Sequence, residues 1–169
     1  MWEGTISELG ITDEVIKQNM KKEKGFRDVF PIDTLPKKIK KFEKEIISLD
    51  ISTGPGTHWV CYYNDPQYDF VEYFDPFGEY INKGFRQEKA VTFSFSKPKC
   101  PKSIETYLKT SGKKPIYNTG FLQKIDFVKC GYFYMKYITE RNKGDPPARV
   151  IYSLTQYPSD YNENLVLNK

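Results

Sequence analysis

Apolar and polar residues alternate along several short stretches of this chain, a pattern typical of β-strands with one face in a core. The segment 64–67, Asn-Asp-Pro-Gln, is rich in turn-forming residues. The stretches on either side of it are therefore expected to pair as a hairpin. The pattern predicts main strands at 45–52, 57–63, 68–74 and 116–123, with shorter extended pieces at 26–30 and 91–95.

Other segments carry the signals that start and stop helices. Thr12 stands before two acidic residues, as an N-cap does, and Gly25 follows as a stop. Pro36 suits the first turn of a second helix, and Gly112 ends a third. The predicted helices are 12–22, 36–43 and 102–110, the last with Ile104, Tyr107 and Leu108 inward, and the apolar segment 149–154 is expected to pack back on the core.

The densest apolar stretch begins at Phe127 and continues through Ile138. It is too dense for one stripe of a surface helix, so it predicts a helix buried on most sides. Cys130 falls in or near its first turn, with Asp126 as the candidate N-cap and Gly131 leaving the backbone beside the sulfur uncrowded. Unpaired N–H groups and the positive end of the helix dipole favour a thiolate there. This position suits a nucleophile.

Strands and helices occur in separate blocks, and some of the strands are linked by a hairpin. This arrangement predicts an α+β fold, in which a mixed central β-sheet packs against the buried helix that carries Cys130. A chain of 169 residues fits a single domain, 1–169, with a substantial core. Twelve Phe, thirteen Tyr and two Trp supply bulky core material, which argues against global disorder.

No stretch approaches the roughly 20 apolar residues of a membrane span, and the first residues do not begin a signal peptide. We therefore expect a soluble, intracellular protein with no membrane partner. Three cysteines and one histidine make a poor zinc set, so no metal is expected. The odd number of cysteines fits a reducing compartment. Cys61 is expected to be packed in a strand, and Cys100 to be exposed beside prolines.

The formal net charge is +4, and the lysines are unevenly spread. Such clusters can bind DNA non-specifically through its phosphates, with salt-sensitive affinity. Glu43 and Glu45 lie among them, as on an ordinary solvated face, so both interpretations stay open. The clusters are Lys21, Lys22 and Lys24; Lys37, Lys38, Lys40, Lys41 and Lys44; and Lys97, Lys99, Lys102, Lys109, Lys113 and Lys114.

A cysteine nucleophile needs a base, and His58 is the only histidine in the chain. It precedes Trp59 at the start of the predicted strand 57–63. The next predicted strand ends at Asp75, where Pro76 stops it. If these strands pair antiparallel, His58 opens one and Asp75 closes the other at the same edge. A hydrogen bond between their side chains is then expected.

Four short motifs occur in a fixed order along the chain. They are His58-Trp59, then Asp75-Pro76-Phe77-Gly78, then Gln123, and seven residues later Cys130-Gly131. In this order the chain resembles the adenovirus-type (adenain-like) maturation proteases, which are related to the SUMO-specific proteases. The resemblance runs from about Phe26 to Leu165, and the protease of a virophage or a similar large-capsid DNA element would be a close relative. Lys129 departs from the small or acidic residue often found before the nucleophile.

The resemblance implies a papain-like (adenain-like) cysteine protease fold with catalytic residues His58, Asp75, Gln123 and Cys130. The Cys130 thiolate would attack a peptide carbonyl, and the His58 imidazolium, held by Asp75, would protonate the leaving amine. The Gln123 side chain and the Cys130 N–H would stabilise the oxyanion. Trp59 is expected to pack beside His58 and to narrow the substrate groove.

The resemblance further implies a thiol endopeptidase that processes viral capsid or core precursor polypeptides during virion maturation. It implies cleavage after small residues, particularly glycine, in the virion and at the intracellular assembly site of the host cell. The chemistry itself requires no cofactor. DNA or a peptide is the activator that the resemblance suggests.

Two other functions stay open. A protease that deconjugates a SUMO-type protein would share the catalytic residues, but it needs a broad surface for a folded substrate. A non-catalytic module that binds nucleic acid or capsid would not need the intact set of Cys130, His58 and Asp75. Each of these residues also has a purely structural interpretation, as a packed cysteine, a histidine beside tryptophan and a strand-end turn. Their joint order favours catalysis.

Overall fold

A computed structural model describes residues 12–49, 59–75, 93–94, 101–118 and 130–155. Within them the strands form one mixed sheet of six strands in the order β1-β2-β3-β4-β6-β5. The pairs β1/β2 and β4/β6 are parallel, and the other neighbouring pairs are antiparallel. The strands are β1 (Phe26–Pro31), β2 (Lys44–Ser48), β3 (Trp59–Tyr63), β4 (Phe70–Phe74), β5 (Phe93–Ser94) and β6 (Lys114–Asn118).

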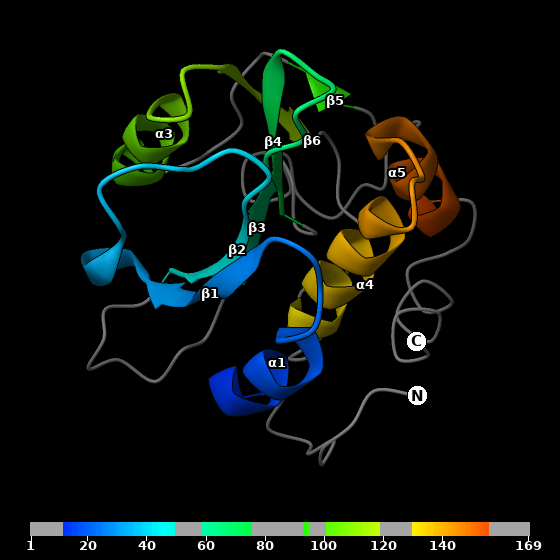
Figure 1. Ribbon diagram of the computed structural model, residues 1–169, viewed down its shortest axis with the longest axis horizontal. Helices are drawn as coiled ribbons and strands as arrows, with labels where there is room; N and C mark the ends of the chain where they lie inside the picture. The colour runs from blue at the N-terminus through cyan, green and yellow to red at the C-terminus, as the bar shows by residue number, and fades with distance from the viewer. Residues whose placement is uncertain (1–11, 50–58, 76–92, 95–100, 119–129, 156–169) are drawn as a thin grey trace, which may run out of the picture.

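Helices cover both faces of this sheet (Figure 1). α3 lies on one face, and α4, with α1 and α5, lies on the other. The predicted α+β class, with a mixed central sheet packed against a buried helix, is confirmed. The helices are α1 (Asp13–Met20), the 3-10 turn η1 (Ile32–Thr34), α3 (Lys102–Lys109), α4 (Cys130–Asn142) and α5 (Pro147–Thr155).

The predicted start and stop signals of two helices are confirmed. The Thr12 hydroxyl accepts a hydrogen bond from the Val15 N–H at 3.3 Å, which caps α1. After α1, Gly25 has φ +76°, and a Cβ at that position would lie 2.2 Å from the Phe42 carbonyl oxygen. Only glycine fits this turn into β1. At the other helix, Gly112 has φ +77° just beyond α3, and the three predicted inward side chains of α3 are buried.

The predicted helix over 36–43 is wrong. Leu35 has φ −59° and ψ 141°, an extended conformation that a following proline favours. The Ile39 N–H donates to Thr110 Oγ1 at 3.0 Å, and the Lys40 N–H donates to the Glu43 carboxylate at 2.7 Å. These backbone donors are therefore satisfied by side chains, one of them distant in sequence, and the segment crosses the end of α3 as an irregular connection.

The strands lie close to their predicted positions, but they are not half exposed. Every residue of β2 and β3 is buried, because helices or connecting segments cover both faces. The turn between β3 and β4 is the predicted hairpin. Five parts of the predicted extended segments lie outside the described residues, namely 50–52, 57–58, 91–92, 95 and 119–123.

The most apolar segment forms the predicted buried helix, with Cys130 as its first helical residue. Nearly all side chains from Gly131 to Thr139 are buried, and Lys136 is the exception. The segment 149–154 belongs to α5, whose Val150, Ile151 and Leu154 join the core around α4, so it packs back as expected. Asp126, the candidate N-cap, lies outside the described residues. No helix in the described part of the chain is long and apolar enough to cross a membrane.

Candidate active site

The predicted catalytic residues fall partly within the described structure. Asp75 follows the last residue of β4 and is 8% exposed. Cys130 begins α4, and Gly131 is buried in the first turn. His58 and Gln123 lie outside the described residues. Trp59, the residue after His58, begins β3.

The ends of β3 and β4 meet as predicted. The strands are antiparallel, with Cys61 opposite Phe74 and Tyr62 opposite Tyr73. One further step in this register would place Asp75 opposite Val60. The chain therefore enters β3 at the same end of the sheet at which it leaves β4.

Two hydrogen bonds align α4 with β3. Near the start of both elements, the Tyr134 hydroxyl donates to the Trp59 carbonyl oxygen. Near their ends, the Tyr63 hydroxyl donates to Asn142 Oδ1 at 2.6 Å. The strand rises roughly 13 Å between its two contacts, and the helix rises roughly 12 Å between its two. α4 and β3 therefore run in the same direction, with the start of the helix beside the start of the strand.

A buried ion pair aligns α4 with β4. Arg141 Nε and Nη2 donate to the two oxygens of Glu72 at 2.8 and 2.7 Å, and Glu72 is fully buried. The Tyr137 hydroxyl donates to the same carboxylate. Cys130 lies about 10 Å before Tyr137 along the helix, and Asp75 lies about 10 Å beyond Glu72 along the strand. Because α4 and β4 run in opposite directions, the start of α4 lies at the Asp75 end of the sheet.

Trp59 has a structural anchor that the sequence did not predict. Its indole Nε1 donates to Asp13 Oδ1 in the first turn of α1 at 2.9 Å, and the residue is 4% exposed. The tryptophan therefore belongs to the core between α1, α4 and the sheet. Its expected packing beside His58 involves a residue outside the described ones and stays a prediction.

Sequence reasoning also missed Asn118, the last residue of β6. Its side-chain Oδ1 accepts the Asp75 N–H at 2.8 Å, and its Nδ2 donates to the Asp75 carbonyl at 2.7 Å. Both residues are buried. The one signal in the sequence was a polar residue at the end of the run Pro-Ile-Tyr-Asn, which many strand ends share.

Cys61 is packed in β3, as predicted, and is completely buried. Burial raises the pKa of its thiol well above the ordinary value, and the charges of Glu72 and Asp75 raise it further. Such a thiol is a poor nucleophile at neutral pH. Cys100 lies outside the described residues.

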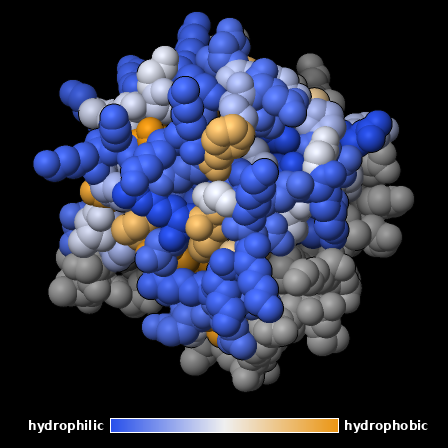
Figure 2. Space-filling view, in the orientation of Figure 1, coloured by the Kyte–Doolittle hydropathy of each residue, from blue (hydrophilic) through white to orange (hydrophobic). Residues whose placement is uncertain are grey.

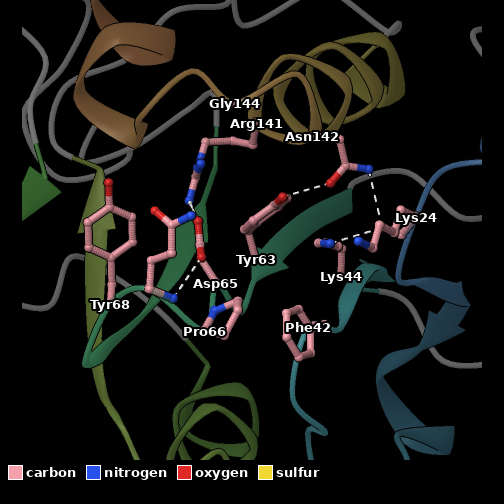
Figure 3. Close-up of a pocket in the computed structure, with 11 residues that line it drawn as sticks. Lys24, Phe42, Lys44, Tyr63, Asp65, Pro66, Tyr68, Arg141, Asn142 and Gly144 are labelled. Carbon is pink, nitrogen blue, oxygen red and sulfur yellow. Dashed lines mark hydrogen bonds and ion pairs between the residues drawn. The ribbon is translucent and has the colours of Figure 1, made fainter.

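A polar cavity of about 220 Å³ lies at the C-terminal end of α4, the end away from Cys130 (Figure 3). There the Tyr63 ring has the Arg141 guanidinium 4.4 Å and the Lys44 ammonium 4.7 Å from its centroid. Burial alone would lower the pKa of Arg141, but the hydrogen bonds and charge of Glu72, with Asp65, raise it above the ordinary value. Arg141 therefore stays charged and locks the end of α4 to the hairpin.

Lys44 does not belong to the exposed lysine cluster in which the sequence analysis placed it. It is only 4% exposed, its Nζ donates to the Lys24 carbonyl at 2.9 Å, and burial lowers its pKa. It is a core residue and not part of a solvated basic face. Its cluster neighbours Lys37, Lys38, Lys40 and Lys41 are exposed.

A buried carboxyl group lies on the other face of the sheet. Glu45 in β2 is fully buried, and its Oε2 accepts hydrogen bonds from the hydroxyls of Tyr62 and Tyr107 at 3.0 and 3.2 Å. Burial raises its pKa to about 8, with a further contribution from the charge of Glu43. Glu45 is therefore largely protonated at neutral pH, which the strand pattern did not predict.

In the part of the chain that the structure describes, no three His, Cys, Asp or Glu side chains are grouped so that they could hold a metal ion. Comparison of the chain with known protein families and with characterised proteins finds no match. The function must therefore be argued from the site itself.

Proposed function

We propose that this protein is a cysteine endopeptidase with Cys130 as nucleophile, His58 as its proton partner and Asp75 as the residue that orients the imidazole. The observation that supports this most is the alignment of α4 with β3 and β4. This alignment brings three positions to one end of the sheet. They are Cys130, the first residue of α4; Trp59, the residue after His58; and Asp75.

Covalent geometry strengthens this argument. Consecutive Cα atoms are about 3.8 Å apart, so His58 cannot be far from Trp59. Cys130 precedes Tyr134 by about 6 Å of helix rise, and the Tyr134 hydroxyl bonds the Trp59 carbonyl. This contact between α4 and the first residue of β3 supports the proposed pairing of a Cys130 thiol with a His58 imidazole.

The environment of Cys130 suits a thiolate. α4 has 13 residues, and the aligned peptide dipoles of a helix leave a positive partial charge at its N-terminus, which favours a thiolate over a thiol. Cys61, by contrast, lies in the middle of the core. Of these two cysteines, we therefore propose the one at the helix start as the reactive thiol.

The chemistry proceeds in two stages. The Cys130 sulfur forms a bond to the substrate carbonyl carbon, and the oxyanion accepts hydrogen bonds from the Cys130 N–H and the Gln123 side chain. When the C–N bond breaks, the His58 imidazolium gives its proton to the leaving amine. Water, deprotonated by His58, then hydrolyses the thioester, and the thiolate is regenerated.

The substrate class rests on the resemblance of the four sequence motifs to those of adenovirus-type proteases. We propose viral capsid or core precursor polypeptides as substrates, cut after small residues such as glycine during virion maturation.

The exposed lysines of the 37–41 segment would supply non-specific DNA contacts. In Figure 2, hydrophilic side chains cover most of one face of the molecule, and hydrophobic residues form small, separate patches.

A cleavage assay tests this function. The purified protein is incubated with a library of glycine-containing peptides, alone and with DNA, and with a folded SUMO-type fusion. We expect peptide cleavage by the wild type and none by Cys130→Ala or His58→Ala. Asp75→Asn should reduce the rate by roughly 100-fold or more, because the imidazole loses its orienting carboxylate. Efficient cleavage of the folded fusion with none of the peptides would overturn the maturation role in favour of deconjugation.

A further inference from the structure

Asn118 and Asp75 form a reciprocal pair of buried hydrogen bonds. The Asn118 side-chain amide accepts from the Asp75 N–H at 2.8 Å and donates to the Asp75 carbonyl at 2.7 Å. Asn118 is 1% exposed. The two bonds also settle the orientation of the amide, since its oxygen meets a donor and its nitrogen meets an acceptor.

This pair lies where the regular sheet ends. β4 and β6 pair in parallel, and the last residues in their register are Tyr73 and Tyr117. Beyond them the Asn118 side chain takes the place of a neighbouring strand and satisfies both backbone groups of Asp75. The next residue, Pro76, has no N–H to continue a ladder. Asn118 is therefore the tie between β6 and the strand end that presents the Asp75 side chain.

A primary amide is well suited to this task. It offers a donor and an acceptor side by side, as a peptide group does. An aspartate in its place would face the Asp75 carbonyl with a second oxygen, and a serine is too short to span both groups. With its N–H and C=O both fixed, Asp75 has little freedom to rotate its Cα–Cβ direction.

We infer that Asn118 is a positioning residue of the proposed active site: by holding the backbone of Asp75, it fixes the direction of the carboxylate that the proposed mechanism uses to orient the His58 imidazole. This inference rests on the proposed protease function. Because Asn118 is only 1% exposed, we expect it to act through Asp75 and not by contact with substrate. A residue that only stabilises the fold would affect activity whether or not the Asp75 carboxylate is present.

The test is a double-mutant cycle on peptide cleavage. Asn118→Ser and Asn118→Asp are each made in the wild type and in the Asp75→Ala background. A displacement of about 1 Å at a catalytic group costs on the order of 100-fold, so we expect kcat/KM to fall roughly 10- to 100-fold in the wild type, mainly through kcat. In the Asp75→Ala background, we expect no further loss.

Two further measurements keep folding and function apart. The pH profile of kcat/KM should shift in the Asn118 variants, because the imidazole loses part of its support from Asp75. The matched control is Asn64→Ser, which removes a buried amide that bonds the Lys40 carbonyl at 2.9 Å at the other end of β3. It should lower thermal stability to a similar extent and leave the pH profile unchanged. If Asn118→Ser does not fold, Asn118→Gln, which keeps the amide group on a longer side chain, decides with the same readouts.

The outcomes are distinct. Asn118 variants that cleave like the wild type, or that lose as much activity in the Asp75→Ala background as in the wild type, would overturn the positioning role and leave the protease proposal standing. A wild-type protein that cleaves no peptide, and whose Cys130 reacts with iodoacetamide as an ordinary thiol with or without His58, would overturn both.

Discussion

The Tyr134 hydroxyl in α4 donates a hydrogen bond to the backbone carbonyl of Trp59 in β3. This contact joins the second turn of the helix that begins at Cys130 to the residue that follows His58. Both residues are buried in the core. This buried hydroxyl is therefore one of the contacts that fix α4, which begins at the proposed nucleophile, against β3, which follows the proposed base in the chain.

Tyr134→Phe should loosen this alignment with little change in volume. A buried hydrogen bond of this kind contributes about 1 kcal/mol, and an acceptor left without its partner costs about 1–3 kcal/mol. We expect the free energy of unfolding to fall by that amount in urea titrations, and peptide cleavage to fall with it. Tyr152→Phe, on the exposed face of α5, is the control and should change neither. Cleavage at the wild-type rate by Tyr134→Phe would argue against this contact as the aligning element.

Among the ion pairs that α4 makes in the described structure, the one between Arg141 and Glu72 should cost the most free energy of unfolding when it is broken. Both side chains are almost fully buried, so Glu72→Gln takes from Arg141 the carboxylate that it meets through two hydrogen bonds. The cost should be at most about 3–5 kcal/mol, because the guanidinium keeps its ion pair with Asp65. Arg141→Lys should also be destabilising, because an ammonium cannot make the two-pronged contact. Denaturant unfolding checks both changes. The control is Lys143→Ala, which breaks an exposed ion pair with Glu140 and should cost less than about 1 kcal/mol.

A combined replacement separates pairing from packing. If Glu72→Leu and Arg141→Leu are made together, the double variant should lose less stability than the sum of the two single variants, since neither charge of this pair stays buried without the other. Asp65 still loses its ion pair with Arg141 in the double variant. Additive losses would mean that the two side chains stabilise the protein independently of each other.

Local signals in the sequence predicted much of this fold. Thr12 and Gly112 mark helix ends through their own side-chain or backbone properties, and both were confirmed. The helix predicted over 36–43 failed because its backbone donors are taken by Thr110 and Glu43. A bond between residues 39 and 110 depends on tertiary structure that no local pattern contains.

The candidate site also has parts that the sequence predicts and parts that it does not. The strand ends that bring Trp59 and Asp75 together follow from the hairpin and could be predicted. The clamp of Asn118 on Asp75 could not, since it depends on β6 pairing with β4 across a long connection. The burial of Glu45 was also missed, because a charged residue in an alternating strand normally faces solvent.

Glu45 should make stability depend on pH. Its pKa is about 8 in the folded protein, against an ordinary value of 4.5. The folded state therefore keeps a proton that the unfolded state releases, and the associated stability is lost as pH rises from about 4.5 to about 8. The slope for one such group is at most about 1.4 kcal/mol per pH unit.

Glu45→Gln should remove this contribution, because the amide does not titrate. The measurement is the free energy of unfolding at several pH values, taken as the difference between variant and wild type. That difference should change steadily across the interval and level off above pH 8. The same substitution at the exposed Glu14 is the control. A flat difference curve for Glu45→Gln would show that Glu45 is ionised throughout.

The exposed lysines at 37, 38, 40 and 41 provide a test of DNA binding. The logarithm of the binding constant should fall linearly with the logarithm of salt concentration, with a slope of about −0.9 per phosphate contact. Replacing all four lysines by alanine should make this slope shallower, by about 0.9 for each lysine that contacts a phosphate. Fluorescence anisotropy with a short duplex measures it, with Lys143→Ala as the control. An unchanged slope would place any DNA contact elsewhere.

The most direct test of the protease proposal is the rate at which iodoacetamide alkylates Cys130 between about pH 4 and 9, followed by mass spectrometry. We expect fast labelling that persists well below the ordinary thiol pKa of about 8.5 and is lost in His58→Ala. Cys61 should stay unlabelled in the folded protein, which gives an internal reference. Labelling of Cys130 that follows an ordinary thiol titration, with DNA and precursor peptides present or absent and regardless of His58, would contradict the proposed thiolate and imidazolium pair.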